Sequence, residues 1–271
     1  MMAKNYSLTD LRYLMARLRD PETGCPWDIK QSYSTIASHT IEEVYEVVDA
    51  IERNNLSDLS EELGDLLFQI VFYCQLAEEQ DEFDFDTVIN HITSKLVRRH
   101  PHVFPEGTLE STRAGSSIDE QQIKKNWEAI KQEERQDKGN SGILDDVPMA
   151  LPAQLRATKL QKRAANYNFD WPNTKGVIDK VKEELAELQQ EVDSGDKARQ
   201  EEELGDLMFA CVNLARHLSI DPERALAKTN NKFKRRFESM DAELDLKNNQ
   251  SLDTDSLEQA WNNAKKAEKN S

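Results

Sequence analysis

Glycine and proline are scarce in this chain, with 9 and 8 residues among 271. Aromatic residues are also few, at 7% of the sequence. Sandwiches and barrels need many tight turns, and tight turns depend mainly on glycine, proline and small polar residues. The strong alternation of apolar and polar residues that marks a strand is absent as well. These absences predict an all-α protein.

Long apolar runs and a basic charge balance are missing too. The most apolar stretch, Leu66 to Cys74, is interrupted by Gln69 and is too short to span a bilayer. The first residues lack the apolar core of a signal peptide. The formal net charge is −16, whereas surfaces that bind nucleic acids or membranes are normally basic. We therefore expect a cytoplasmic protein that binds neither directly, although a few local cations could still hold a small anion.

Common cofactor and nucleotide motifs are also absent. The three cysteines, Cys25, Cys74 and Cys211, are odd in number and lack metal-ligand spacing, so we interpret them as reduced thiols. The sequence contains no Gly-x-x-x-x-Gly-Lys-Ser/Thr and no Gly-x-Gly-x-x-Gly after a strand. Its five histidines do not form the Glu-x-x-His pairs of a di-iron bundle.

What the sequence does contain is a pair of acidic helices. Glu184 and Glu187 are three residues apart, as are Glu203 and Asp206, and such pairs share one helix face. The turn-like residues 193–196 between them predict two antiparallel helices whose acidic faces meet. An apolar stripe at helical spacing lies opposite the acids, formed by Ile178, Val181, Leu185, Leu188 and Val192 on the first helix and by Leu204, Leu207, Met208 and Cys211 on the second.

No basic residue stands among these four acids, so the carboxylates would repel one another unless a cation lay between them. Hard oxygen ligands of this kind suit Mg²⁺, with Mn²⁺ as an alternative. One glutamate pair three residues apart is common on any solvated helix face, and a second copy of the pattern is what favours a site. That copy occurs 141 residues earlier, with the same spacing, at Glu43, Glu46, Glu62 and Asp65.

The repeat extends beyond the acids and predicts two tandem helical modules. We place them at residues 1–136 and 148–271, joined by a polar, glycine-containing linker at 137–147. Helices are expected at 8–19, 36–53, 57–79, 86–99 and 119–135, and then at 153–165, in the acidic pair within 181–209, at 222–240 and around Trp261.

Each module also carries Lys-x-x-Arg-Arg after its acidic pair, at Lys232, Arg235 and Arg236 in the second module. Alone, such a triplet is usually a solvated face. Next to a Mg²⁺ cluster it is better explained by a polyphosphate chain held between the metal and the guanidinium groups. The repeated tryptophan, Trp261, either stacks on a base or belongs to the core.

The doubled Glu-Glu-x-x-Glu and Glu-x-x-Asp motifs, with Gly-Cys-Pro-Trp-Asp at 24–28 and Arg-Arg-His-Pro-His-Val-Phe at 98–104, resemble the MazG family. This family belongs to the all-α nucleoside triphosphate pyrophosphatases, and the resemblance covers nearly the full chain. It implies a homodimer that hydrolyses nucleoside triphosphates to monophosphate and pyrophosphate with Mg²⁺. By position it also implies metal ligation by Glu184, Glu187, Glu203 and Asp206, and substrate contacts from Lys180, Lys232, Arg235, Arg236 and Trp261.

Two questions stay open at the level of sequence. A regulatory nucleotide-binding protein with little turnover would use the same motifs as an enzyme. The acceptor of the attacking water's proton is a spare carboxylate, such as Glu183, or a weakly bound metal ligand. We expect catalytic roles for Glu183, Glu184 and Glu187 and for the basic triplet.

The two modules also differ. The offset of 141 places His39 at the position of Lys180 and Phe72 at the position of Asn213. Asn213 lies two helical turns beyond Asp206, so it can hydrogen-bond a ligand on the acidic face, whereas Phe72 offers only apolar contact. We therefore expect residues 145–271 to carry most of the catalysis, and the first module to form a weaker, altered or regulatory site.

Overall fold

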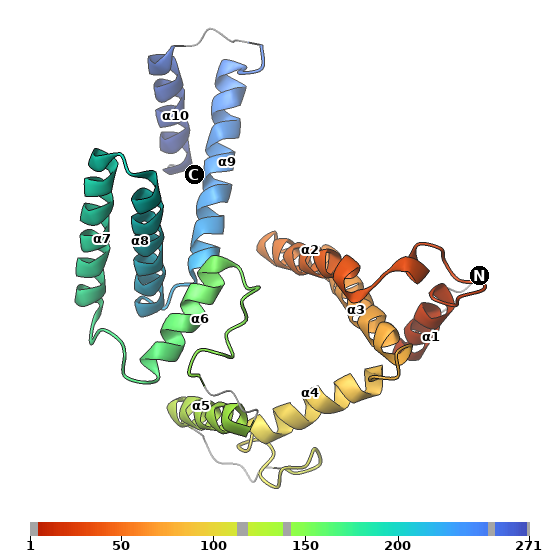
Figure 1. Ribbon diagram of the computed structural model, residues 1–271. Helices are drawn as coiled ribbons and strands as arrows, with labels where there is room; N and C mark the ends of the chain where they lie inside the picture. The colour runs from red at the N-terminus through yellow and green to blue at the C-terminus, as the bar shows by residue number, and fades with distance from the viewer. Residues whose placement is uncertain (1–4, 113–118, 138–141, 249–252, 270–271) are drawn as a thin grey trace. The chain divides into compact units, whose positions relative to one another are not determined.

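The computed structural model describes residues 5–112, 119–137, 142–248 and 253–269 (Figure 1). Within these ranges all regular structure is helical, which confirms the all-α prediction. Besides a short 3₁₀ helix at Asp28–Lys30, the α-helices are α1 (Leu8–Leu18), α2 (Tyr33–Glu52), α3 (Leu56–Glu78), α4 (Phe85–Arg99), α5 (Glu120–Asp137), α6 (Ala153–Ala165), α7 (Thr174–Ser194), α8 (Lys197–His217), α9 (Pro222–Leu244) and α10 (Thr254–Lys269). In the described residues no helix is both long and apolar enough to cross a membrane.

The chain divides into two compact units, residues 1–131 and 132–271, with the boundary inside α5. The segment expected to be a linker, 137–147, is not uniform. Residues 138–141 lie outside the described part of the chain. The residues after them pack into the second unit, where Val147 is buried and Asp146 pairs with Arg163 at 2.7 Å.

The first unit is built around the antiparallel pair α2 and α3, with α1 packed against α3. Capping residues determine where the pair begins. The Ser32 side chain accepts a hydrogen bond from the Thr35 amide at the start of α2, and Asn55 accepts from the amides of Ser57 and Asp58 at the start of α3. The helices enclose one apolar core, formed by Met15, Ile36, Val71, Phe72, Cys74, Leu76 and Phe85.

The second unit repeats this plan with α7 and α8 side by side and α6 against α8 (Figure 1). The turn between α7 and α8 forms where the sequence predicts it. Gly195 ends α7 at a φ of 80°, a left-handed conformation that glycine adopts without steric cost. Asp196 then caps α8 by accepting from the amides of Ala198 and Arg199. The last two helices, α9 and α10, pack against each other.

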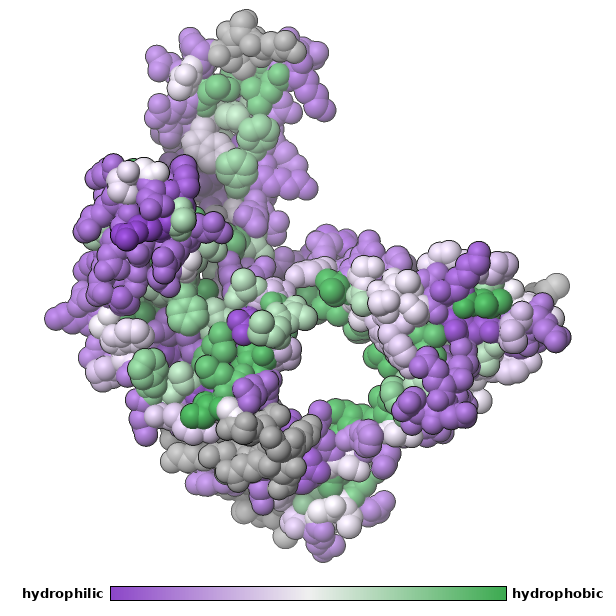
Figure 2. All heavy atoms as spheres, viewed as in Figure 1, coloured by the Kyte–Doolittle hydropathy of each residue, from purple (hydrophilic) through white to green (hydrophobic). Residues whose placement is uncertain are grey.

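The apolar stripes of the acidic helices are only partly covered within one chain. On α7, Leu185 and Val192 are 56% and 53% exposed, and on α8 Met208 is 51% exposed. Figure 2 shows further apolar side chains on the surface of the column formed by α9 and α10, where Phe233 and Phe237 are exposed. Apolar faces of this kind are typical of surfaces that another chain covers.

Candidate metal and nucleotide site

The acidic residues of α7 and α8 converge across the helix pair. Carboxylate oxygens of Glu184, Glu203 and Asp206 lie within 4.8 Å of one another, and Glu184 is buried. The pKa of Glu203 is raised by burial and by the neighbouring charges of Asp206 and Glu184. The antiparallel arrangement predicted from the spacing therefore brings three of the four expected carboxylates together.

A second group shares Glu184 and extends along α7. Oxygens of Glu183, Glu184 and Glu187 also lie within 4.8 Å of one another. Burial and a hydrogen bond with Glu184 raise the pKa of Glu187. A carboxyl whose pKa is raised takes up a proton more readily than a solvated one, which is a property required of a general base.

One feature of the site differs from the sequence expectation that no base lies among the acids. The ammonium group of Lys180 lies 2.6 Å from Glu184 Oε1 and 2.7 Å from Glu183 Oε1. Hydrogen bonds to these two carboxylates raise the pKa of Lys180, so the amine stays charged. The lysine sits one helical turn before its partners, and this spacing brings the side chains together on one face of α7.

The first unit forms the same cluster from the matching positions. Oxygens of Glu43, Glu62 and Asp65 lie within 4.8 Å of one another. Burial first, and then the charges of Asp65 and Glu46, raise the pKa of Glu43. His39 Nδ1 lies 3.7 Å from Glu42, a longer and weaker counterpart of the Lys180 contacts. The duplicated spacing thus produces duplicated geometry.

The donor set fits a hard divalent cation. Opposite ligands in an octahedral Mg²⁺ site are about 4 Å apart, and the oxygens of each carboxylate group lie within 4.8 Å of one another, near enough for one ion to contact them. The donors are carboxylates, which Mg²⁺ and Mn²⁺ prefer to nitrogen or sulfur. Burial, and after it the neighbouring negative charges, raise the pKa of Glu43 and Glu203, and a bound cation would relieve the repulsion between these carboxylates.

A cavity of about 560 Å³ opens beside the cluster in the second unit. Its wall combines aromatic and aliphatic groups with polar groups from α6, α7 and α8. The lining residues are Leu144, Leu160, Gln161, Ala164, Phe169, Asp170, Trp171, Val177, Lys180, Glu184, Asp206, Phe209, Ala210, Asn213 and Arg216. An apolar pocket with a few convergent polar groups, adjoining a metal-type cluster, is typical of a site for a small organic ligand.

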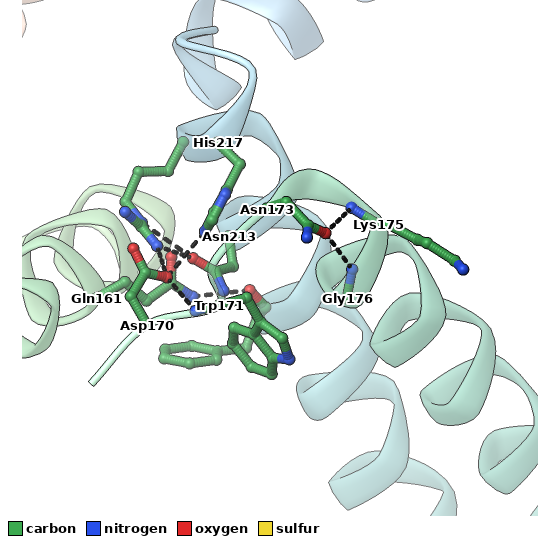
Figure 3. A network of polar contacts seen from close by, with 10 residues as sticks. Gln161, Asp170, Trp171, Asn173, Lys175, Gly176, Asn213 and His217 are labelled. Atoms are coloured by element: carbon green, nitrogen blue, oxygen red, sulfur yellow. Dashed lines mark hydrogen bonds and ion pairs between the residues drawn. The ribbon is translucent and has the colours of Figure 1, made fainter. Parts of the chain in front are cut away.

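One end of the cavity is a polar network (Figure 3). Arg216 donates from Nη2 to Asp170 at 2.5 Å and from Nε and Nη2 to Asn213 Oδ1 at 2.9 and 2.8 Å. His217 Nε2 lies 2.8 Å from the same Asp170 oxygen. Burial alone would raise the pKa of Asp170, but the hydrogen bonds from Arg216 and His217 outweigh it and lower this pKa to about 2.

The corresponding region of the first unit is filled. Phe72 occupies the position of Asn213, is 1% exposed, and packs edge-on against Phe68. The guanidinium of Arg19 lies over the Phe72 ring at 5.3 Å. The first unit therefore keeps the carboxylates but has core where the second unit has the polar end of its cavity.

The predicted site residues divide into two groups. Lys180, Glu184, Asp206 and Asn213 line one cavity. Glu183 and Glu187 form one carboxylate group with Glu184, and Glu203 forms another with Glu184 and Asp206. The basic triplet and the tryptophan lie elsewhere in the unit, on α9 and α10, and do not line the cavity. Arg235 and Arg236 pair with Glu268 at 2.8 and 2.6 Å, and Trp261 packs against Phe233. Lys232 lies on α9 one turn before Arg236.

Sequence reasoning missed Asp170, Arg216 and His217. Arg216 is three residues after Asn213 and so shares its helix face, which was a usable signal. Asp170 lies 46 residues from Arg216 in a segment between helices, and no periodicity links such positions.

Comparison with known proteins agrees with the duplicated architecture. The MazG nucleotide pyrophosphohydrolase domain matches residues 31–104 and again 173–240. The chain is 47% identical over 259 residues to a nucleoside triphosphate pyrophosphohydrolase of Escherichia coli K12, covering 94% of this chain and 95% of the relative. It is 40% identical to the nucleoside triphosphate pyrophosphohydrolase/pyrophosphatase MazG of Thermotoga maritima, covering 94% of each chain. With both helix pairs matched and the similarity running nearly from end to end, the chain belongs to the MazG nucleotide pyrophosphohydrolase family.

Proposed function

We propose that this protein hydrolyses nucleoside triphosphates to nucleoside monophosphate and pyrophosphate, using Mg²⁺ or Mn²⁺ held by Glu184, Glu187, Glu203 and Asp206. The observation that carries the proposal is the contact between the acidic cluster and the cavity, which share Glu184 and Asp206. A nucleoside in the cavity would place its phosphates toward the carboxylates. The names of the relatives from Escherichia coli and Thermotoga maritima support the same reaction.

The metal would neutralise charge on the polyphosphate and, as a Lewis acid, polarise a phosphoryl oxygen so that the phosphorus is more readily attacked. The chain's own residues have two further tasks. A carboxylate of the group Glu183, Glu184 and Glu187 accepts the proton of the attacking water as the bond between the α- and β-phosphates breaks. Lys180, fixed by two carboxylates, supplies a positive charge beside the phosphates. No covalent intermediate is required.

Arg235, Arg236 and Lys232 would hold the polyphosphate on its other side, and Trp261 would contact the substrate. In one chain the two arginines already bind a carboxylate, that of Glu268. This pairing supports the proposal because a guanidinium pair that binds one oxyanion has the geometry to bind another. The exposed apolar stripes on α7 and α8 support the further proposal of a homodimer, which sedimentation of the pure protein tests directly.

We assign the reaction mainly to residues 145–271. Phe72 fills the position that would complete a cavity in the first unit, while Glu43, Glu62 and Asp65 remain able to hold a cation. The first unit would then bind metal or nucleotide weakly, or serve a regulatory role. A protein that only binds nucleotides as a signal is the alternative for the whole chain, and turnover distinguishes the two.

The test is an incubation of the pure protein with Mg²⁺ and each common nucleoside triphosphate, with pyrophosphate, orthophosphate and nucleotide products measured separately. We expect monophosphate and pyrophosphate in equal amounts, and no turnover in excess EDTA because the single ammonium of Lys180 does not neutralise the clustered carboxylates next to a polyphosphate. Full turnover in EDTA would contradict the metal assignment. Release of orthophosphate would mean that the substrate lies in the opposite direction, and binding without turnover would favour the regulatory alternative.

A further inference from the structure

The side-chain amide of Asn213 has its oxygen end occupied and its nitrogen end available. Asn213 is 5% exposed and lines the cavity. Its Oδ1 accepts two hydrogen bonds from Arg216, at 2.9 and 2.8 Å. In the part of the chain that the structure describes, no hydrogen-bond partner is found for its Nδ2. The NH₂ end of the amide is therefore available to donate to a ligand in the cavity.

The orientation of this amide is fixed by the groups behind it. Arg216 is anchored at 2.5 Å by Asp170, which also lies 2.8 Å from His217 (Figure 3). If the Asn213 amide rotated by half a turn, its NH₂ group would face the guanidinium, and two donors would meet without an acceptor. The contacts from Asp170 to Arg216 and from Arg216 to Asn213 therefore keep the amide in one orientation, with its Nδ2 end turned away from the guanidinium.

We propose that Asp170 and Arg216 are positioning residues that hold the Asn213 amide with its donor toward the ligand, and that the cavity consequently prefers nucleobases bearing an exocyclic carbonyl to those bearing an exocyclic amino group. A carbonyl oxygen accepts the Nδ2 hydrogen bond, whereas an amino group would bring a second donor against it in a largely apolar pocket. The proposal rests on the proposed function, because it assigns the nucleoside to this cavity. The first unit, with Phe72 at this position, would have no such preference.

The first experiment compares kcat/KM for two substrate pairs that exchange carbonyl and amino groups, UTP with CTP and ITP with ATP. We expect the wild-type protein to favour the carbonyl member of each pair by about tenfold, the effect of one hydrogen bond of ordinary net strength. In Asn213→Asp, Arg216 keeps its acceptor but the cavity receives an oxygen in place of the NH₂ group. The preference should then invert toward CTP and ATP.

The second experiment tests whether Arg216 acts through Asn213. Arg216→Met releases the amide, so the carbonyl preference should fall toward equality, with the change appearing in the KM ratio of each pair. The double variant Asn213→Leu/Arg216→Met should show the same ratio of kcat/KM between carbonyl and amino substrates as Asn213→Leu alone, because the amide that Arg216 positions is no longer present. Arg216→Lys keeps a donor for Oδ1 and should retain most of the preference.

Arg199→Met is the matched control. It removes an arginine from the same helix whose partners, Glu191 and Asp196, do not line the cavity, so the substrate ratios should be unchanged. Thermal melting of each variant identifies any that do not fold. If a variant does not fold, the wild-type and Arg216→Lys proteins are compared instead. Calorimetric titration of each with UMP and with CMP measures the preference between carbonyl and amino bases without turnover.

The outcomes separate the two proposals. Absence of pyrophosphate from every nucleotide would contradict the proposed function itself. Turnover with no carbonyl preference, or an Arg216→Met effect on the ratio that persists undiminished in the Asn213→Leu background, would overturn the positioning proposal alone.

Discussion

At the scale of single residues, the ion pair between Asp170 and Arg216 makes the free energy of unfolding depend on pH. The pKa of this carboxyl is about 2 in the folded chain and 3.8 when unperturbed, so its contribution is complete above about pH 4 and is lost as the pH falls toward 2. The shift corresponds to about 2 kcal/mol of unfolding free energy. We expect Asp170→Asn to destabilise the protein at pH 7 and to differ less from wild type at pH 3 in urea unfolding. A difference that stays constant between these pH values would contradict the assignment.

A substitution at Gly176 tests whether the cavity wall formed by Trp171 contacts the substrate. A Cβ at this position would lie 2.5 Å from Cδ1 of Trp171, which lines the cavity, so Gly176→Ala should displace the indole and raise KM for nucleotides. Gly205 is the matched control, because a Cβ there has no neighbour within 4 Å. Gly205→Ala should leave KM unchanged and can stabilise α8 by up to about 1 kcal/mol. Equal KM values for the two variants would show that the Trp171 wall does not contact substrate.

Single residues also show what the sequence could and could not predict. The carboxylate positions follow from helical spacing and one turn, both of which are local properties, and the structure brings Glu184, Glu203 and Asp206 together. The roles of Asp170 and of the cavity do not follow, because they depend on how α6, the loop after it and α8 pack. Lys180 illustrates both cases. Its contact with Glu184 follows from a spacing of four residues, yet the acidic cluster was expected to contain no base.

At the scale of whole elements, α9 carries the prediction about phosphate binding. We expect Arg235→Ala to raise KM for nucleoside triphosphates while changing unfolding free energy by only about 0.5 kcal/mol, since its side chain is 61% exposed. Arg236→Ala should act in the same direction. Lys234→Ala is the control, because Lys234 lies on the same helix but is not part of the predicted triplet. Wild-type kinetics in both arginine variants would mean that the polyphosphate lies elsewhere.

Most expected helix boundaries lie within a few residues of the observed ones because capping residues and turns are local signals, whereas the acidic pair expected within 181–209 extends from Thr174 to His217. Whether each apolar helix face is buried within one chain was not predictable. The stripe containing Leu185 and Val192 has the spacing of a core-facing surface, yet both residues are more than half exposed in one chain. Periodicity identifies an apolar face but not whether the same chain or another one covers it.

At the scale of the whole molecule, the duplication is the feature that sequence predicts best. Identical spacing of four acids in each half produces the same carboxylate triplet in each unit, Glu43, Glu62 and Asp65 in the first and Glu184, Glu203 and Asp206 in the second. The functional difference between the units rests on fewer positions. Phe72 and Asn213 occupy equivalent sites, and the exchange of an amide for a phenyl ring replaces the polar end of a cavity with core.

The most direct measurement is therefore pyrophosphate release by two matched variants, Glu184→Gln and Glu43→Gln, each assayed with Mg²⁺ at saturating nucleotide. Both changes remove one charge from equivalent positions of the repeat. We predict that Glu184→Gln lowers turnover by about a hundredfold or more, as when a group that stabilises transition-state charge is lost. Glu43→Gln should retain most of the wild-type rate. Equal losses, or the larger loss in Glu43→Gln, would contradict the assignment of catalysis to the second unit.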